Sequence, residues 1–214
     1  SVPFADLTIM VRPPTLIPRP ETEEWVMWLV QKLDSVRDQP LRILDLCTGS
    51  GCIALALAKA FPRAQVLGVD IAPEAIALAR ENAEKNRLIN VDFVCADLWD
   101  GVPDGQQYDL VVANPPYISA AEYEQLQPEV VAWEDARALT AAQQGLAVYV
   151  AIAQKITACL ARDSVLVRQC LPVMVMELGT DAEAVRGIFV EKGFSELIVE
   201  QDLQRVDRWL AGWI

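Results

Sequence analysis

Hydrophobic and polar positions follow two alternating patterns from residue 41 to the end of the sequence. Short runs that are almost wholly apolar are followed by longer segments in which apolar residues recur every three or four positions. The short runs predict buried strands, and the longer segments predict helices. The expected strands span residues 41–46, 65–70, 91–95, 108–113, 173–178, 196–199 and 208–213. The expected helices span residues 52–60, 73–87, 145–160 and 181–192.

This alternation indicates an α/β fold. Strands that are apolar throughout need cover on both faces, so the pattern predicts a parallel sheet between two layers of helices. The helix at 52–60 is almost wholly apolar, and we expect it to be buried. Residues 161–176 fit the pattern poorly, because they lack a glycine turn and Pro172 interrupts an apolar run. That segment predicts either an additional strand or residues missing between two elements.

The beginning of the sequence has a different pattern. Apolar and polar positions alternate along residues 2–11, which is typical of extended chain, and we expect a hairpin there. Four prolines exclude a regular helix over the residues that follow: Pro13, Pro14, Pro18 and Pro20. A helix is expected from about Glu21, where acidic residues suit its N-terminal dipole. We therefore expect a hairpin and Pro-rich segment over residues 1–20 and one larger domain over residues 21–214.

Composition excludes several classes of protein. The chain has 18 Lys and Arg against 30 Asp and Glu, a net charge of −12, whereas a protein that holds nucleic acid through its phosphates, or a polybasic membrane anchor, needs a basic face. It has no His, which excludes His-dependent triads and His-containing metal sites. Its five Cys form no C-x-x-C pair, so we expect neither a disulfide framework nor a bound metal. No apolar run reaches the 18 residues of a membrane span.

The first candidate site follows the strand at 41–46. The sequence Asp45-Leu46-Cys47-Thr48-Gly49-Ser50-Gly51 leads into a helix, and its glycines allow backbone N–H groups to approach a ligand there. Asp70 ends the next strand, where a carboxylate can bind both hydroxyls of a ribose. These features predict a nucleoside cofactor, either NAD or S-adenosylmethionine. Ala54 stands in place of the third glycine of the dinucleotide fingerprint, which tilts the choice toward S-adenosylmethionine.

The second candidate site is Asn114-Pro115-Pro116-Tyr117, at the end of the strand at 108–113. A planar amide or arylamine nitrogen is a poor nucleophile because its lone pair is delocalised, so its N–H bonds must be polarised and held in line. The Asn114 side-chain oxygen and the Pro115 carbonyl can accept those two hydrogens, and the prolines fix both acceptors. Tyr117 offers a flat face to the planar group. The motif strengthens the case for S-adenosylmethionine and gives all four residues catalytic roles.

Four motifs carry a family resemblance. They are Leu16-Ile17-Pro18-Arg19-Pro20-Glu21-Thr22-Glu23, the loop from Asp45 to Gly51, Asn114-Pro115-Pro116-Tyr117-Ile118, and Glu177-Leu178-Gly179. Together they resemble the HemK/PrmC family, the glutamine methyltransferases of peptide chain release factors. The resemblance extends from about Phe4 to Trp213. It implies a class I S-adenosylmethionine-dependent methyltransferase, a Rossmann-like α/β fold whose seven-stranded, mainly parallel sheet carries helices on both faces. It also implies that residues 21–214 are the catalytic domain.

The resemblance also implies roles for individual residues. The cofactor-binding positions it implies are Thr22, Asp45, Cys47, Thr48, Gly49, Ser50, Gly51, Asp70, Ile71, Asp97, Leu98 and Asn114. Among them, the loop at 47–51 would cradle the cofactor, Asp70 would bind its ribose, and Asp97 and Leu98 would border the adenine. Residues 114–117 would hold the substrate glutamine. Thr22 is expected either at the methionine end of the cofactor or as a helix cap.

Two positions depart from the family pattern. Cys47 stands where many methyltransferases have glycine, so it is strained if that position requires a positive φ. The Gln that the family has soon after Glu-x-Gly is not found after Gly179.

We therefore expect an enzyme that moves a methyl group from S-adenosylmethionine to the side-chain amide nitrogen of a release-factor glutamine, leaving S-adenosylhomocysteine. The alternatives are a DNA adenine amino-methyltransferase, which the net charge disfavours, and a non-catalytic cofactor-binding protein, which the intact Asn114 motif disfavours. We expect a monomer whose partner is the release factor, with no direct contact to nucleic acid or membrane. The residues of the loop at 46–52, Leu-Cys-Thr-Gly-Ser-Gly-Cys, resemble those of organellar members of the family. We therefore expect the mitochondrial matrix as the location, with the bacterial cytoplasm as the alternative.

Overall fold

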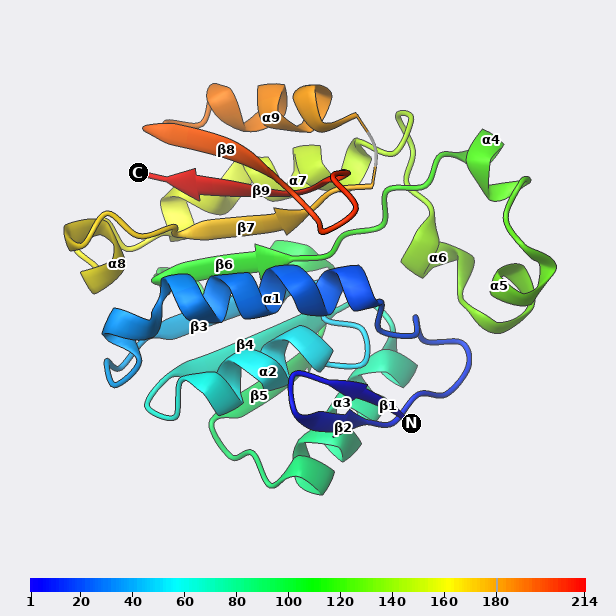
Figure 1. The fold of residues 1–214 in the computed structure, drawn as a ribbon, viewed down its shortest axis with the longest axis horizontal. Helices are drawn as coiled ribbons and strands as arrows, with labels where there is room; N and C mark the ends of the chain where they lie inside the picture. The colour runs from blue at the N-terminus through cyan, green and yellow to red at the C-terminus, as the bar shows by residue number, and fades with distance from the viewer. Residues whose placement is uncertain (180) are drawn as a thin grey trace.

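A seven-stranded sheet forms the centre of the computed structural model, which describes residues 1–179 and 181–214 (Figure 1). The strands are β3 (Arg42–Leu46), β4 (Gln65–Asp70), β5 (Val91–Cys95), β6 (Leu110–Ala113), β7 (Met174–Glu177), β8 (Glu196–Gln201) and β9 (Asp207–Trp213). They lie in the order β5-β4-β3-β6-β7-β9-β8. The first five pair in parallel, whereas β9 is antiparallel to both of its neighbours. The expected seven-stranded, mainly parallel sheet is confirmed.

Helices cover both faces of this sheet. The longer ones are α1 (Pro20–Lys32), α2 (Cys52–Ala60), α3 (Pro73–Asn86), α7 (Ala147–Cys159) and α9 (Ala182–Val190). In Figure 1, α1 and α2 lie side by side in front of the sheet and α7 lies behind it, where it contacts α9. The side chains from Cys52 to Ala58 are all buried, because α2 is enclosed between the sheet and its neighbouring helices. The expectation of a buried helix at 52–60 is confirmed.

The N-terminal residues form a hairpin of β1 (Val2–Phe4) and β2 (Leu7–Ile9), which packs on α3. Its turn uses Ala5 and Asp6, both with positive φ. Asn82 of α3 anchors the chain just after the hairpin: its Oδ1 accepts from the Met10 N–H at 2.7 Å, and its Nδ2 donates to the Met10 carbonyl at 3.1 Å. The same Nδ2 donates to the Ser50 carbonyl at 3.0 Å. One buried side chain therefore links the N-terminal segment to the glycine loop.

Between β6 and α7 the chain makes a long excursion that the sequence pattern does not predict. It contains three short helices, α4 (Ala120–Tyr123), α5 (Pro128–Trp133) and α6 (Ala136–Leu139). A parallel bridge between Ile118 and Thr140 closes its base. We call residues 119–139 the strap. In Figure 1 the strap extends away from the sheet beyond the end of β6.

The connection before β7 corrects one expectation. Residues 165–168 form a short helix, α8 (Val165–Arg168), and not an additional strand. Ser164 caps α8, because its hydroxyl accepts from the Val167 N–H at 3.3 Å. Cys170 then adopts φ 53°, so it forms the left-handed turn that a glycine usually forms. Ser164 thus begins the short helix, and Cys170 turns the chain toward β7.

Candidate active site

Two loops meet where the strand order of the sheet reverses. Strand β3 lies between β4 and β6, so the chain leaves it in one direction and returns on its other side. Ligands of open α/β sheets bind at such a switch point, beyond the carboxyl ends of the strands. The loop at 47–51 follows β3, and residues 114–117 follow β6. The topology therefore places both of the candidate sites at the same edge of the sheet.

The loop at 47–51 has three residues in the left-handed region. They are Cys47 with φ 60°, Gly49 with φ 54° and Gly51 with φ 81°. A Cβ at position 51 would also lie 3.0 Å from the Cβ of Ala79, a tight contact, so a side chain there would push against α3 as well as strain the backbone. A Cβ at Gly49 would meet open space, which leaves room for a ligand beside it. Cys47 carries the strain expected of a side chain at a position suited to glycine.

Asp45 holds this loop from the end of β3. Its Oδ2 accepts from the Thr48 hydroxyl at 2.6 Å and from the Ala54 N–H at 3.1 Å. The side chain is fully buried, and among the described residues its Oδ1 has no hydrogen-bond partner. Burial raises the pKa of the Asp45 carboxyl to about 7, and the nearby charge of Asp70 acts in the same direction.

Asp70 is fixed by backbone donors on two sides. Its Oδ2 accepts from the Gly49 N–H at 2.8 Å, and its Oδ1 accepts from the Ala72 N–H at 2.9 Å. Burial raises the pKa of this carboxyl, and the two N–H donors oppose the rise. A carboxylate has about four lone-pair sites, so each oxygen can accept a further hydrogen bond. Asp70 therefore presents two oriented acceptors to any ligand with hydroxyl groups.

A cavity of about 330 Å³ opens at this edge of the sheet. Eight predicted site residues line it: Cys47, Gly49, Asp70, Ile71, Asp97, Leu98, Asn114 and Pro116. Seven others lie outside this lining: Thr22, Asp45, Thr48, Ser50, Gly51, Pro115 and Tyr117. The volume is within the range of small-molecule sites. The carboxylate of Asp70 and the apolar side chains of Ile71 and Leu98 give the cavity both polar and apolar walls.

Tyr117 is held between two glycines. A Cβ on Gly179 would lie 1.9 Å from the Cε2 atom of Tyr117, and a Cβ on Gly145 would lie 2.1 Å from its carbonyl oxygen. Any other residue at either position would displace the tyrosine. Burial raises the pKa of Tyr117 to about 12, and the charge of Glu177 adds to the rise. The phenol is therefore neutral at physiological pH.

Thr22 does not cap its helix. The N-cap of α1 is Arg19, whose side chain makes no capping bond. Thr22 lies in the first turn of α1, and its side chain is buried. Its hydroxyl donates to Glu177 Oε2 at 2.7 Å and accepts from Asn114 Nδ2 at 3.3 Å. The helix-cap alternative is therefore wrong. The structure joins Thr22 to the Asn114 motif instead.

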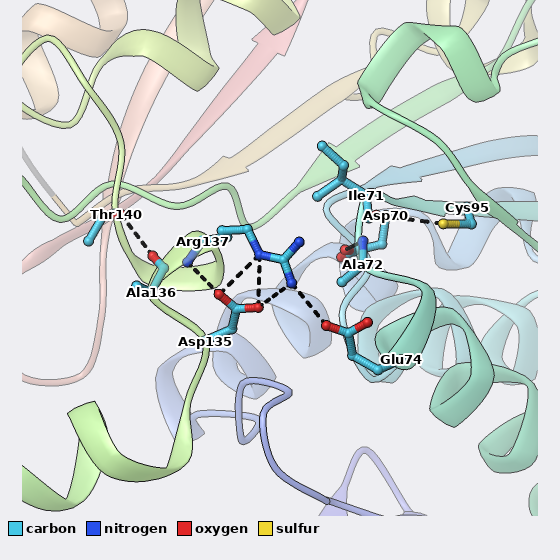
Figure 2. Close-up of polar contacts among 9 residues, drawn as sticks. All are labelled: Asp70, Ile71, Ala72, Glu74, Cys95, Asp135, Ala136, Arg137 and Thr140. Atoms are coloured by element: carbon cyan, nitrogen blue, oxygen red, sulfur yellow. Dashed lines mark hydrogen bonds and ion pairs between the residues drawn. The ribbon is translucent and has the colours of Figure 1, made fainter.

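The strap supplies a wall of the cavity that sequence reasoning missed. Figure 2 shows Arg137 donating to Asp135 Oδ2 at 2.6 Å and to Glu74 Oε1 at 3.0 Å, which joins the strap to the first turn of α3. Arg19 of the Pro-Arg-Pro motif donates to both oxygens of the buried Glu134 at 2.8 Å. The cavity-lining residues outside the predicted set are Pro14, Thr15, Leu16, Val69, Ala72, Glu74, Ala75, Asp135, Arg137, Ala138, Thr140 and Val148.

Within residues 1–179 and 181–214, no group of three or more Cys, Asp or Glu side chains is placed to hold a metal ion. None of the helices in that part of the chain is both long enough and apolar enough to cross a membrane.

Comparisons with known proteins identify the family of the chain. Residues 26–155 match the family model of the methyltransferase small domain. The chain is 39% identical over 214 residues to the release factor glutamine methyltransferase of Geobacter sulfurreducens, covering 99% of this chain and 70% of that protein. It is 38% identical over 210 residues to the enzyme of the same name from Escherichia coli, covering 98% and 71%.

Solved structures give the same fold at lower identity. A methyltransferase from Pyrococcus furiosus has a TM-score of 0.63 at 16% identity and covers 97% of this chain and 90% of its own. Precorrin-6y C5,15-methyltransferase from Geobacter metallireducens has a TM-score of 0.61 at 14% identity, with 93% of each chain covered. These likenesses establish the class I methyltransferase fold. The close sequence relatives go further, and the chain belongs to the release factor glutamine methyltransferase family.

Proposed function

We propose that this protein transfers a methyl group from S-adenosylmethionine to the side-chain amide nitrogen of a glutamine in a peptide chain release factor. The observation that carries the proposal is the Asn-Pro-Pro-Tyr segment at the switch point, with Asn114 and Pro116 in the wall of the cavity. The names of the relatives from Geobacter sulfurreducens and Escherichia coli point to the same substrate.

The residues of the cavity suit S-adenosylmethionine. Asp70 offers two oriented acceptors for the ribose hydroxyls, and the space beside Gly49 admits a ligand close to the loop. Ile71 and Leu98 provide apolar surfaces of the kind that an adenine ring requires, with Asp97 beside them. We assign Cys47 and Asn114 to the same binding site because they line the cavity, and Asp45, Thr48, Ser50 and Gly51 because they shape the loop.

The protein's contribution to the reaction is to orient and polarise the glutamine amide. S-adenosylmethionine supplies a methyl group on a sulfonium, which is already a good leaving group. Asn114 Oδ1 and the Pro115 carbonyl oxygen would each accept one N–H of the amide, which makes its nitrogen more nucleophilic and aims its lone pair at the methyl carbon. On transfer, the electron pair of the S–C bond would go to sulfur and leave S-adenosylhomocysteine, and the amide nitrogen would lose one of its two protons to solvent water. Pro115 and Pro116 limit backbone motion around both acceptors.

The two alternative functions are less well supported. A DNA adenine methyltransferase needs a basic surface for the phosphate backbone, and this chain has a net charge of −12. The intact Asn-Pro-Pro-Tyr segment, with Asn114 in the wall of the cavity, disfavours a non-catalytic cofactor-binding protein. The acidic surface suits a basic protein partner better than a nucleic acid.

Methyl transfer from labelled cofactor to a purified release factor, with duplex DNA as the control substrate, tests this proposal. Asn114→Ala should leave the cofactor Kd nearly unchanged and lower kcat by about 100- to 1,000-fold, because Asn114 acts mainly in the transition state.

Asp70→Ala should weaken cofactor binding by about 10- to 100-fold. Asp92→Ala, on the exposed side of β5, is the matched control and should change neither. Labelling of DNA, or a loss of kcat below tenfold for Asn114→Ala, would contradict the proposal.

Three further expectations stay proposals. The relatives named above are bacterial, which favours the bacterial cytoplasm over the mitochondrial matrix as the location. A monomer remains our proposal for the oligomeric state. We also keep residues 1–20 as a segment separate from the catalytic domain at 21–214, although Asn82 ties the two parts together.

A further inference from the structure

A chain of hydrogen bonds runs from Asn114 into the interior of the protein. Asn114 Nδ2 donates to Thr22 Oγ1 at 3.3 Å, and Thr22 Oγ1 donates to Glu177 Oε2 at 2.7 Å. Trp25 Nε1 donates to the same Glu177 oxygen at 2.8 Å. Thr22, Trp25 and Glu177 are 2%, 0% and 1% exposed, so water does not compete for the two bonds to Glu177, whereas the bond from Asn114 is partly buried. Three distant parts of the chain, α1 and the ends of β6 and β7, meet at this point.

The chemistry of the groups fixes the direction of every bond. A carboxylate can only accept, so the Thr22 hydroxyl must give its single hydrogen to Glu177. The Thr22 oxygen then offers only lone pairs to Asn114. The amide nitrogen of Asn114 can face those lone pairs, whereas the amide oxygen would set two acceptors against each other. Burial raises the pKa of Glu177, but a proton on its other oxygen would leave Oε2 accepting as before.

The consequence for Asn114 is a single orientation of its side-chain amide. An amide without such a partner can rotate by a half turn and exchange its donor for its acceptor. With Nδ2 directed to Thr22, Oδ1 is the atom of the amide that remains free to bind a ligand. The proposed methyl transfer requires an acceptor at this place, because the group to be bound is a substrate N–H. A flipped Asn114 would present a second donor to that N–H and repel it.

We propose that Thr22 and Glu177 are positioning residues, which hold the Asn114 amide with its oxygen toward the substrate nitrogen. This inference rests on the proposed function and deepens it. It gives the Glu177-x-Gly179 segment two related tasks, since Glu177 orients Asn114 through Thr22 while Gly179 leaves room for the ring of Tyr117. Both ends of the Asn-Pro-Pro-Tyr segment are thereby held from the end of β7.

Substitutions at Thr22 test the proposal in the full chain. Thr22→Val removes the hydroxyl at nearly constant volume, and Thr22→Ser keeps it. With a release factor as substrate, Thr22→Val should lower kcat by about 10- to 100-fold, as expected when a catalytic group loses its orientation, and leave the cofactor Kd within about twofold. Thr22→Ser should stay within about threefold of the parent kcat. Equal kcat for Thr22→Val and the parent would overturn the proposal.

A control and a double variant separate positioning from loss of stability. Tyr149→Phe removes a buried hydroxyl that donates to the Glu177 backbone carbonyl at 2.7 Å, away from the Thr22 bond. It should lower Tm and keep kcat within about threefold. In an Asn114→Ala background, adding Thr22→Val should lower kcat by less than a further factor of about two, because the effects of residues that act through one group are not additive. Fully additive losses would show that Thr22 acts elsewhere and would overturn the proposal.

One readout does not depend on turnover. In NMR spectra of the protein, the Nδ2 hydrogen that Asn114 donates to Thr22 should exchange more slowly in the parent and in Thr22→Ser than in Thr22→Val. Unchanged exchange in Thr22→Val would overturn the proposed positioning of Asn114 by Thr22, even if all variants were active. A parent chain that binds cofactor but labels no release factor would overturn the proposed function. The exchange rates would still test whether Thr22 positions Asn114.

Discussion

Cys47 illustrates how one residue can depart from its structural optimum at a ligand site. It lines the cavity with φ 60°, a conformation that costs an L-residue with a Cβ about 1–2 kcal/mol. Its neighbours Gly49 and Gly51 adopt positive φ without that cost. Burial raises the pKa of the Cys47 thiol, with the charge of Asp70 acting in the same direction, so the thiol is protonated and unreactive.

Substitution of Cys47 measures the strain directly. Cys47→Ala and Cys47→Gly both remove the sulfur and differ only by a Cβ. Relief of strain favours the glycine variant, and the larger entropy of an unfolded glycine opposes it by about 0.4–1 kcal/mol. We expect Cys47→Gly to be more stable than Cys47→Ala by about 0.5–1 kcal/mol in urea unfolding. A more stable alanine variant would mean that the loop relaxes to negative φ at this position.

At the scale of elements, paired asparagines on α3 hold the N-terminal segment. Asn82 and Asn86 each bond both backbone groups of one residue, Met10 and Thr8 respectively. Asn82 is fully buried, whereas Asn86 is partly exposed. Water can replace the bonds of Asn86 but cannot reach those of Asn82, so the same substitution should have different costs at the two positions.

The prediction for this pair concerns the free energy of unfolding. Asn82→Ala leaves the Met10 backbone groups and the Ser50 carbonyl without their partner, and should lower the free energy of unfolding by about 2–4 kcal/mol. Asn86→Ala should lower it by less than about 1 kcal/mol. Urea titrations of both variants check this, and equal losses would mean that the hairpin region is solvated in solution.

The regular elements were predictable because each one carries its own periodic signal. The helix at 52–60 and the strands at 65–70 and 91–95 have the expected bounds. The strap was not predicted, because helices of four to six residues are too short to show a periodicity. Its position depends on distant contacts, such as the bond from the Asp135 N–H to the Pro14 carbonyl at 2.7 Å. Arg137 and Glu74 were therefore missing from the predicted site.

For the whole molecule, sheet topology explains why the two sequence motifs form one site. Cys47 and Asn114 lie 67 positions apart in the sequence and reach the same cavity because β3 and β6 are neighbours at the switch point. The sequence placed each motif at the end of a predicted strand, and the order of those strands in the sheet comes from the structure. It could not predict that Thr22 bonds Glu177, because neither the spacing nor the residue types of such a pair are unusual.

The charge state of the whole molecule leads to a last prediction, on the pH dependence of stability. Asp45 has a pKa of about 7 in the folded chain, raised by burial, against about 4 when unfolded. Between these values the folded state holds a proton that the unfolded state has released, so stability falls as pH rises from about 4 to 7. The chain has no His to mask this titration.

Asp45→Asn should remove this component, because the amide oxygen can still accept from Thr48 and Ala54 but does not titrate. From pH 5 to pH 8, without cofactor, we expect the free energy of unfolding of the parent to fall by about 2–3 kcal/mol more than that of Asp45→Asn. Other buried carboxyls with raised pKa values, such as Glu177, are present in both proteins and cancel in the difference. Parallel pH profiles in urea titrations would show that Asp45 is already ionised at pH 5, and that its buried charge is compensated in the folded chain.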